Sequence, residues 1–482
     1  MSFTEFYCNA STGDNTQAGS TEGAAVFTFA NGNWNASTLI FTAAGANLSA
    51  VTVGMFAALM VDGAAVAASV HRITAVDDAL DTITVSGTVF SGIAPSTSAT
   101  ARTIKVGGVW KGPNALEDFP FDFLESDTTN TNGDLPRTNF KNNAVYNVTG
   151  AIVPGDASTH WEGYTTTPGD GGRATIDGGS VGASFVLLQV GASHQRYKNL
   201  IFNQNGATGS NAGVSVTTTN TILENCVFSN MRGHGCVTTG NSTKLLACEA
   251  FANNLSNTAS TAGINMGSSG GELIRCVSHD NTGSNTSGFR ITTALTSIIN
   301  CIADTNGADG FLFTGANGPL NIYQCDSYNN TGDGLEIDNT TATSICTIES
   351  CNFVKNGGYG INLDTVQQVR ARIANCGFGS GTQANTSGTI NSVANSVETG
   401  TVTYAADLTP WTDPADGDFR LNLAAAIGAG SGAFTQTQSG YGDPNPTVGY
   451  PDIGAAMSNT PVASGVAGPP PRRNQYVQII PD

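Results

Sequence analysis

The stretch from Cys301 to Cys351 reads CIADTNGADGFLFTGANGPLNIYQCDSYNNTGDGLEIDNTTATSICTIESC and contains two turns of a degenerate repeat. Each turn opens on a cysteine, has an asparagine five residues later, and then a glycine followed by alternating apolar residues. A fixed period of short alternating segments without helical spacing indicates a β-solenoid. The repeat cysteines are separated by 22, 28, 25, 24, 26 and 25 residues and are Cys226, Cys248, Cys276, Cys301, Cys325, Cys351 and Cys376.

Equivalent residues of successive coils are predicted to form columns along the solenoid axis, about 4.8 Å apart. Cysteine is small and apolar, so a column of thiols can fill a narrow dry interior. Asparagine at a turn can satisfy the backbone of neighbouring coils, and glycine permits a tight bend into the next strand. The asparagine column comprises Asn205, Asn253, Asn281, Asn306, Asn330 and Asn356, with Met231 and Gly381 as exceptions; the glycine column comprises Gly213, Gly235, Gly263, Gly288, Gly310, Gly334 and Gly360.

The repeated cysteines also raise the alternatives of disulfide bonds or a metal site. Neighbouring side chains on parallel strands point the same way, which is poor geometry for a bridge. No Cys-x-x-Cys or Cys/His ligand spacing occurs, and Cys8, Cys236 and Cys346 lie outside the column. We therefore favour a packed, reduced column over structural disulfides.

The composition favours strands and turns and limits the partners. Only 12% of the 482 residues are charged, 59 are glycines, and the net charge is −18. Such an acidic chain is not expected to bind nucleic acid or anionic membranes. The start MSFTEFYCNASTGDN has no basic and apolar segments typical of a secretion signal, and the apolar stretch from Val51 to Ala68 is interrupted by Asp62-Gly63. That stretch predicts two buried strands joined by a tight turn.

Four regions are predicted along the chain. Residues 1–105 are expected to be a β-rich head in the form of a small sheet or barrel, and residues 106–140 a connecting and capping segment. Residues 141–400 are expected to form a right-handed parallel β-helix, because crossovers between parallel strands are overwhelmingly right-handed. Residues 401–482 are expected to provide a C-terminal cap and a proline-rich tail, because an open coil leaves an unpaired sheet edge.

Several local phrases strengthen a family resemblance that the repeat suggests. The chain resembles the right-handed parallel β-helix proteins, which include pectate and other polysaccharide lyases, glycoside hydrolases, phage tailspikes and virion adhesins. The resemblance implies the fold but leaves the activity open, since this scaffold hosts both enzymes and inert adhesins. The phrases are FYCNASTGDNTQAG (residues 6–19), WEGYTTTPGDGGRATIDGG (161–179), DGDFRL (416–421), AIGAG (426–430) and PDIGA (451–455).

Outward-facing side chains must carry any chemistry. In each Gly-Φ-x-Φ strand the middle residue is predicted to face solvent, which gives one column of such residues. Two residues further along, a second column contains Asp338 and Asp364, and Asp333 lies at the preceding turn. The first column is Ser215, Val237, Asn265, Arg290, Leu312, Glu336 and Asn362.

Glu336, Asp338 and Asp364 form the single acidic cluster predicted on these columns, and three interpretations of it remain open. The cluster could be a solvated patch, a Ca²⁺ site, or an acid/base pair. Calcium-dependent lyases of the family also need a basic residue, and Arg290 is two coils from Glu336, roughly 10 Å away. We favour the solvated patch. Glu336, Asp338 and Asp364 stay the candidates for a catalytic role, and no cofactor is expected unless the alternative of Ca²⁺ at these three acids holds.

The remaining candidates are weaker. The five histidines have no metal-binding spacing, and the loop around Asp413 and Asp416 lacks the downstream glutamate of an EF-hand. Trp110, Trp161 and Trp411 are candidates for sugar stacking, although a buried anchoring role is the simpler expectation.

Two functional hypotheses follow, from different classes. The first is a structural or adhesive virion-surface protein: a capsid decoration, head spike or tailspike that presents the β-helix and contacts host glycans. Its partners would be other virion proteins, bound through the N-terminal domain or the C-terminal tail, and copies of itself, as in the trimers common among such proteins. The second is a secreted polysaccharide lyase or glycoside hydrolase. The missing export signal and the scarcity of basic outward residues favour the first, with release by cell lysis.

Overall fold

The computed structural model is all-β, with a parallel β-solenoid of about nine turns and a small antiparallel barrel. The chain divides into two compact units, residues 1–179 with 186–202, and residues 180–185 with 203–482. No helix among the described residues is long and apolar enough to cross a membrane. The structure describes residues 3–12, 23–61, 69–86, 99–108, 135–154, 159–179, 182–281, 283–293, 296–315, 319–338, 345–363, 370–391, 397–405, 408–416 and 418–421.

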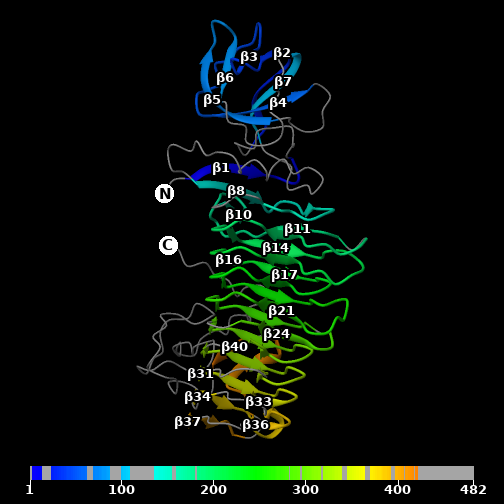
Figure 1. Ribbon diagram of the computed structural model, residues 1–482, viewed down its shortest axis with the longest axis vertical. Helices are drawn as coiled ribbons and strands as arrows, with labels where there is room; N and C mark the ends of the chain where they lie inside the picture. The colour runs from blue at the N-terminus through cyan, green and yellow to red at the C-terminus, as the bar shows by residue number, and fades with distance from the viewer. Residues whose placement is uncertain are drawn as a thin grey trace, which may run out of the picture. The chain divides into compact units, whose positions relative to one another are not determined.

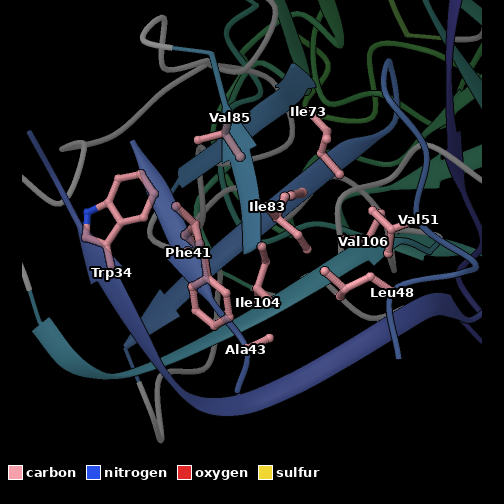
Figure 2. Packing of buried hydrophobic residues seen from close by; sticks show 12 residues of the cluster. Trp34, Phe41, Ala43, Leu48, Val51, Ile73, Ile83, Val85, Ile104 and Val106 are labelled. Carbon is pink, nitrogen blue, oxygen red and sulfur yellow. The ribbon is translucent and has the colours of Figure 1, made fainter. Parts of the chain in front are cut away.

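The first unit contains a closed barrel with the strand order β2-β3-β6-β5-β4-β7. The apolar stretch after Val51 supplies β4, which pairs antiparallel with β5. The sequence predicts both strands within residues 51–68, whereas β5 begins at Ser69, and the predicted turn at Asp62-Gly63 lies outside the described residues. The core of the barrel is formed by aliphatic and aromatic side chains such as Trp34, Phe41 and Ile104, shown in Figure 2. The strands are β2 (Ala25–Asn35), β3 (Ile40–Thr42), β4 (Phe56–Val61), β5 (Ser69–Asp77), β6 (Thr82–Val85) and β7 (Ala99–Gly107).

The first unit also holds the earliest coils, and here the predicted boundaries need correction. The head was expected to span residues 1–105 and the β-helix to start at 141, but β1 (Phe3–Cys8) pairs in parallel with β8 (Leu135–Lys141). Phe6 and Cys8 are buried, so this segment alternates like a coil strand and belongs to the coil sheet. The order in this sheet is β1-β8-β10-β13, with β10 (His160–Tyr164) and β13 (Arg196–Lys198); the other strands are β9 (Tyr146–Asn147), β11 (Ala174–Asp177), β12 (Leu188–Val190) and β14 (Leu200–Asn203).

The second unit stacks its coils into three parallel sheets, drawn as rows of short arrows in Figure 1. The first sheet contains β16 (Ile222–Glu224), β19 (Lys244–Leu246), β22 (Glu272–Ile274), β25 (Thr296–Ile299), β28 (Leu320–Tyr323), β31 (Ile345–Glu349), β34 (Arg370–Ala374) and β37 (Val397–Thr399). The second contains β17 (Val227–Ser229), β20 (Glu249–Phe251), β23 (Val277–His279), β26 (Ile302–Asp304), β29 (Asp326–Tyr328), β32 (Asn352–Val354), β35 (Gly377–Phe378) and β38 (Val402–Thr403). The third contains β15 (Val214–Val216), β18 (Cys236–Thr238), β21 (Thr261–Met266), β24 (Thr286–Ile291), β27 (Phe311–Phe313), β30 (Leu335–Ile337), β33 (Tyr359–Leu363) and β36 (Gly388–Asn391).

Single residues in the left-handed region turn the chain from one sheet to the next. Asn300, with φ of 53°, precedes Cys301, and Thr305, also with φ of 53°, precedes Asn306. One such residue bends the backbone sharply between two strands without a longer loop. The residues before the other six repeat cysteines share this conformation and are Asn225, Ala247, Arg275, Gln324, Ser350 and Asn375.

The seven repeat cysteines are buried and carry free thiols. Each Sγ from Cys248 onward lies near a carbonyl oxygen of the preceding coil; Cys276 Sγ, for example, is 3.3 Å from Leu245 O. The column therefore combines apolar packing with weak S–H donation to backbone oxygens. Cys8, Cys236 and Cys346 are also buried and free.

From Asn253 onward the asparagine column is a continuous chain of side-chain hydrogen bonds. Asn281 Nδ2 donates to Asn306 Oδ1 at 2.9 Å, and Asn306 Nδ2 donates to Asn330 Oδ1 at 2.8 Å. Each amide also donates to a carbonyl of the preceding coil, so both of its donor hydrogens are used. The expected exception at Gly381 is resolved by Asn385, which accepts from Asn356 Nδ2 at 3.0 Å. The short 3-10 helix Gly381–Gln383 inserts residues before the turn and shifts the asparagine by four positions.

The repeated glycines are explained by close packing and not by the predicted backbone bend. None of these glycines has a positive φ. A Cβ atom at Gly288 would lie 2.7 Å from Asn306 Nδ2, and one at Gly334 would lie 2.9 Å from Asn356 Nδ2. From Gly235 onward glycine is required because the asparagine amides pass directly against the backbone, and at Gly213 the Met231 side chain takes that place.

The C-terminal described segment is a hairpin of β39 (Trp411–Asp413) and β40 (Asp418–Leu421). Trp411 and Phe419 are buried and pack edge-on against Tyr328 of β29, with ring centroids 5.6 and 6.1 Å away. Trp411 is thus a buried anchor, as predicted in preference to sugar stacking. Trp161 is also a buried anchor and lies between Phe140 and Tyr197. Trp110 lies outside the described residues.

Candidate acidic site

An acidic cluster lies where two neighbouring strands of the third sheet, β27 and β30, begin. Asp309 and Asp333 each precede the glycine that opens β27 and β30, and Glu336 is the outward residue of β30. One carboxylate oxygen from each of the three lies within 4.8 Å of the others. Asp309 and Asp333 are buried, whereas Glu336 is half-buried. The two aspartates occupy the same slot of the repeat, so stacking brings them together.

Two of the three carboxylates hold the backbone of the next coil. Asp309 Oδ1 accepts a hydrogen bond from Asp333 N–H at 2.8 Å. Asp333 accepts from the Tyr359 N–H and, at 2.8 Å, from Asn362 Nδ2. The two carboxylates thus supply acceptors for backbone N–H groups at the turn of the next coil, where a buried N–H without an acceptor would be costly.

The close approach of the acids changes their protonation. Burial raises the pKa of Asp309, and the neighbouring Asp333 charge adds to the increase. Burial also raises the pKa of Glu336 to about 8, helped by the charge of Asp309, a side-chain hydrogen bond to Asp309, and the charges of Asp333 and Asp338. Stacked like charges are destabilising, so the protonated form of Glu336 predominates at neutral pH.

Glycines make room for the cluster. A Cβ atom at Gly332 would collide with Asp309 Oδ1, and one at Gly358 would collide with Asp333 Oδ1. The approach of backbone to carboxylate is therefore built into the sequence at both turns.

The outward column predicted from the sequence is present in the strand register. Ser215, Val237, Asn265, Arg290, Leu312, Glu336 and Asn362 pair in this order along the third sheet.

The predicted acidic set differs from the observed one. Asp338 is exposed and its charge contributes to the raised pKa of Glu336, and Asp364 lies outside the described residues. Asp309, which the sequence reasoning missed, takes part instead. The signal was available, because the phrases DGF and DGL place an aspartate before the column glycine in both coils.

A calcium ion would find an incomplete set of ligands among these described residues. Ca²⁺ takes six to eight oxygen ligands. The three carboxylates are the only group of three potential ligands found in the described part of the chain, and two of them already accept backbone hydrogens. Cation binding at Glu336, Asp338 and Asp364 stays a prediction.

A second titratable cluster lies on the second sheet. His279 Nε2 is 3.0 Å from Glu249 Oε1, and its Nδ1 is 2.8 Å from Asp280 Oδ2. Although burial disfavours the charged ring, the two carboxylates raise the pKa of His279 to about 9. The imidazolium is therefore enclosed between two acids and also stacks on Phe251. This arrangement ties together two neighbouring coils and leaves no ring nitrogen for catalysis.

Comparison with known proteins supports the architecture. Residues 247–397 match the sequence model of a right handed beta helix region. These coils are a right-handed β-helix. This fold is the one expected from the sequence repeat. A search of curated protein sequences finds no match to the chain.

Solved structures with a similar fold share little sequence. Pectate lyase Pel9A matches with a TM-score of 0.51 and 16% identity, over 69% of this chain and 91% of the lyase. The A-module of the Azotobacter vinelandii mannuronan C-5 epimerase AlgE4 matches with a TM-score of 0.44 and 13% identity, over 55% and 86%. The Dettilon tailspike protein matches with a TM-score of 0.41 and 13% identity, over 57% and 56%. At these identities the similarity describes the fold alone.

Proposed function

We propose that this protein is a virion-surface protein, of the capsid decoration, head spike or tailspike type, whose β-helix binds glycans without cleaving them. The observation that carries the non-catalytic part is the use of the acids. Asp309 and Asp333 accept hydrogen bonds from the next coil, so their carboxylates are committed to the turns. A catalytic carboxylate needs a free approach to its substrate.

The basic residues near the cluster support the same proposal. Arg290 pairs with Leu312, which pairs with Glu336, so two strand spacings of about 4.8 Å separate the arginine from the acid. Its Nη1 donates to Ser260 O at 2.5 Å. His234 is half-buried, and its desolvation together with the charge of nearby Arg290 lowers its pKa to about 4. Neither group is positioned as a base beside the acids.

A glycoside hydrolase is the second candidate, favoured by one observation. The raised pKa of Glu336, about 8, would keep this carboxyl protonated at neutral pH, as a general acid requires. However, Glu336 is hydrogen-bonded directly to Asp309. The paired carboxyl groups of glycosidases are typically about 5 Å or more apart, because the sugar must fit between them.

Two measurements test the proposal. The purified protein, with Ca²⁺, is incubated with acidic and neutral polysaccharides, and new reducing ends and unsaturated products are followed. We expect no turnover, and recovery of the protein from intact particles by mass spectrometry. Turnover abolished by Glu336→Gln, but retained in Glu398→Gln, an exposed acid of β37, would establish the enzyme instead.

The remaining features of the proposal concern assembly and cations. Attachment would use the N-terminal domain or the C-terminal tail, and the protein would be a homo-oligomer, with a trimer as the form to test by light scattering. If Ca²⁺ binds the acids, adding it at pH 8 raises the melting temperature of the parent and not of Glu336→Gln.

A further inference from the structure

The third sheet carries an arginine that no carboxylate neutralises at contact distance. Arg290 is the outward residue of β24 and lies beside Asn265 of β21 in the strand register. Its Nη1 donates to Ser260 O at 2.5 Å, and within the described part of the chain Arg290 makes no ion pair. Lys244 of β19, by contrast, lies 2.7 Å from Glu272. Arg290 is therefore a half-buried cation whose charge is available to a ligand.

The unused edge of this guanidinium is the one that suits an oxyanion. Nε and Nη2 point two parallel N–H donors along one edge, which matches two oxygens of a carboxylate, sulfate or phosphate. Arg290 uses Nη1 for Ser260, whereas Nε is buried without a hydrogen-bond partner and Nη2 reaches solvent. Asn265 Oδ1, on the adjacent strand, is also buried and unpartnered. Buried polar atoms are rarely left unsatisfied, so a bound group would explain both.

A neutral histidine adds a donor near Arg290. His234 precedes β18, and its Nδ1 accepts a hydrogen bond from the Ala262 N–H at 2.9 Å. The ring proton is therefore on Nε2, which reaches solvent and has no partner among the described residues. Desolvation and the charge of Arg290 lower the pKa of His234, and no described carboxylate counteracts them. The local field thus favours an anion rather than a second cation.

We propose that Arg290 and His234 bind an oxyanion, namely a carboxylate, sulfate or phosphate group carried by a glycan, an inference that rests on the proposed glycan-binding function. The Nε and Nη2 donors of Arg290 take two anion oxygens, His234 Nε2 donates to another oxygen, and Asn265 Oδ1 accepts from a sugar hydroxyl. Val237 and Leu312 flank Asn265 and Arg290 in the outward column, are half-buried, and offer apolar contact to the sugar ring. The net charge of −18 does not oppose binding, because distant charges are screened beyond about 8 Å at physiological salt.

The test uses dextran and its carboxymethyl, sulfate and phosphate derivatives, which share one backbone. Binding is measured by calorimetry at physiological salt for the full chain and for Arg290→Gln. The control variant is Lys244→Gln, which removes an exposed cation that is paired with Glu272 on the first sheet. We expect at least one charged derivative to bind the parent about tenfold or more tightly than dextran, and Arg290→Gln to lose this preference, because a charge-assisted hydrogen bond contributes about a factor of ten or more. Lys244→Gln should bind like the parent.

A second variant keeps the test independent of folding. Asn265 Oδ1 has no partner in the free protein, so Asn265→Ala breaks no hydrogen bond at this atom and should not lower the melting temperature. We expect Asn265→Ala to weaken binding of the charged derivative by about threefold or more, because a hydrogen bond to the sugar is lost. If Arg290→Gln melts below the parent, Arg290→Lys replaces it: this variant keeps the charge, lacks the paired donors, and should also lose most of the preference.

The outcomes separate this inference from the proposed function. Equal binding of dextran and its charged derivatives, absence of binding of all three derivatives, or equal losses in Arg290→Gln and Lys244→Gln overturns the oxyanion site. Undiminished binding of a neutral glycan by Arg290→Gln, without any preference for charge in the parent, would leave the proposed function standing while removing this site from it. Cleavage of a charged derivative that still binds through Arg290 would overturn the proposed function and leave the site. A preference for one derivative supports the site and identifies its anion.

Discussion

The asparagine column and the acidic cluster are built by the same stacking, yet they differ in what stacking does to each. In the column, Asn281, Asn306 and Asn330 donate and accept in sequence, so every added coil completes the hydrogen bonds of the previous one. In the cluster, stacked carboxylates repel, and burial with neighbouring charge raises the pKa of Glu336 to about 8. Repetition stabilises groups that are both donors and acceptors, whereas acceptor-only anions need a proton or a cation.

The strongest test of this contrast places an anion inside the neutral core. Cys301→Asp would bury a carboxylate between Cys276 and Cys325, where no cation is available among the described neighbours. We expect a loss of several kcal/mol and failure to accumulate as folded protein, measured by circular dichroism and protease resistance. A variant that melted like the parent would show that the column is not dry.

Removing one link of the asparagine chain should have the next largest effect. Asn306→Ala leaves Asn281 Nδ2 without its acceptor and Ser278 O without its donor. We expect a loss of about 3 kcal/mol in urea unfolding, because buried polar groups are left unsatisfied. The matched control is Asn385→Ala at the end of the chain, which should cost less. Equal losses at the two positions would contradict the cooperative chain.

The histidine cluster shows how a cation makes neighbouring acids compatible. His279→Gln should lower the stability by about 2 kcal/mol at pH 6, because Glu249 loses a charged partner. The folded pKa of about 9 exceeds the unfolded value near 6.5, so this contribution is fully present below pH 6.5 and is lost as the pH rises through 9. The gap between parent and variant should therefore shrink over this window. A gap that stayed constant to pH 10 would show that the charge does not contribute.

The volume of the thiol can be tested apart from the charge. Cys301→Ala removes one sulfur from the buried column and should cost about 1 kcal/mol. It should fold and show the same circular dichroism spectrum as the parent. If Cys301→Ala lost as much stability as Cys301→Asp, the loss in Cys301→Asp would come from disturbed packing rather than from burial of a charge.

The smallest effect is expected from relief of the repulsion in the acidic cluster. The folded pKa of Glu336, about 8, lies above its ordinary value of 4.5, so the parent should lose stability as the pH rises from 4.5 to 8. Glu336→Gln should abolish this slope and be more stable than the parent at pH 8.5, by less than about 1 kcal/mol because the side chain is partly exposed. A variant less stable than the parent at that pH would indicate that the ionised form is held by a bound cation.

The place of a residue within its coil, inward or outward, could be predicted from the sequence. Cysteine spacing located the interior column, and the Gly-Φ-x-Φ phrase gave the outward column that the strand register contains. Asn385 escaped prediction because the 3-10 helix after Ser380 changes the length of one turn. Asp309 escaped because it lies before the strand, at a turn rather than in the alternating pattern.

The sequence by itself determined a solenoid of short parallel strands with a dry thiol column and an amide column, because a period of about two dozen residues repeats the same local chemistry at each coil. Only the tertiary structure decided that β1 pairs with β8, which follows it by more than a hundred residues, and that Asp309, Asp333 and Glu336 meet. Local periodicity encodes where a side chain points. Which side chains become neighbours depends on the register and loop length between coils, which the inter-strand hydrogen bonds set.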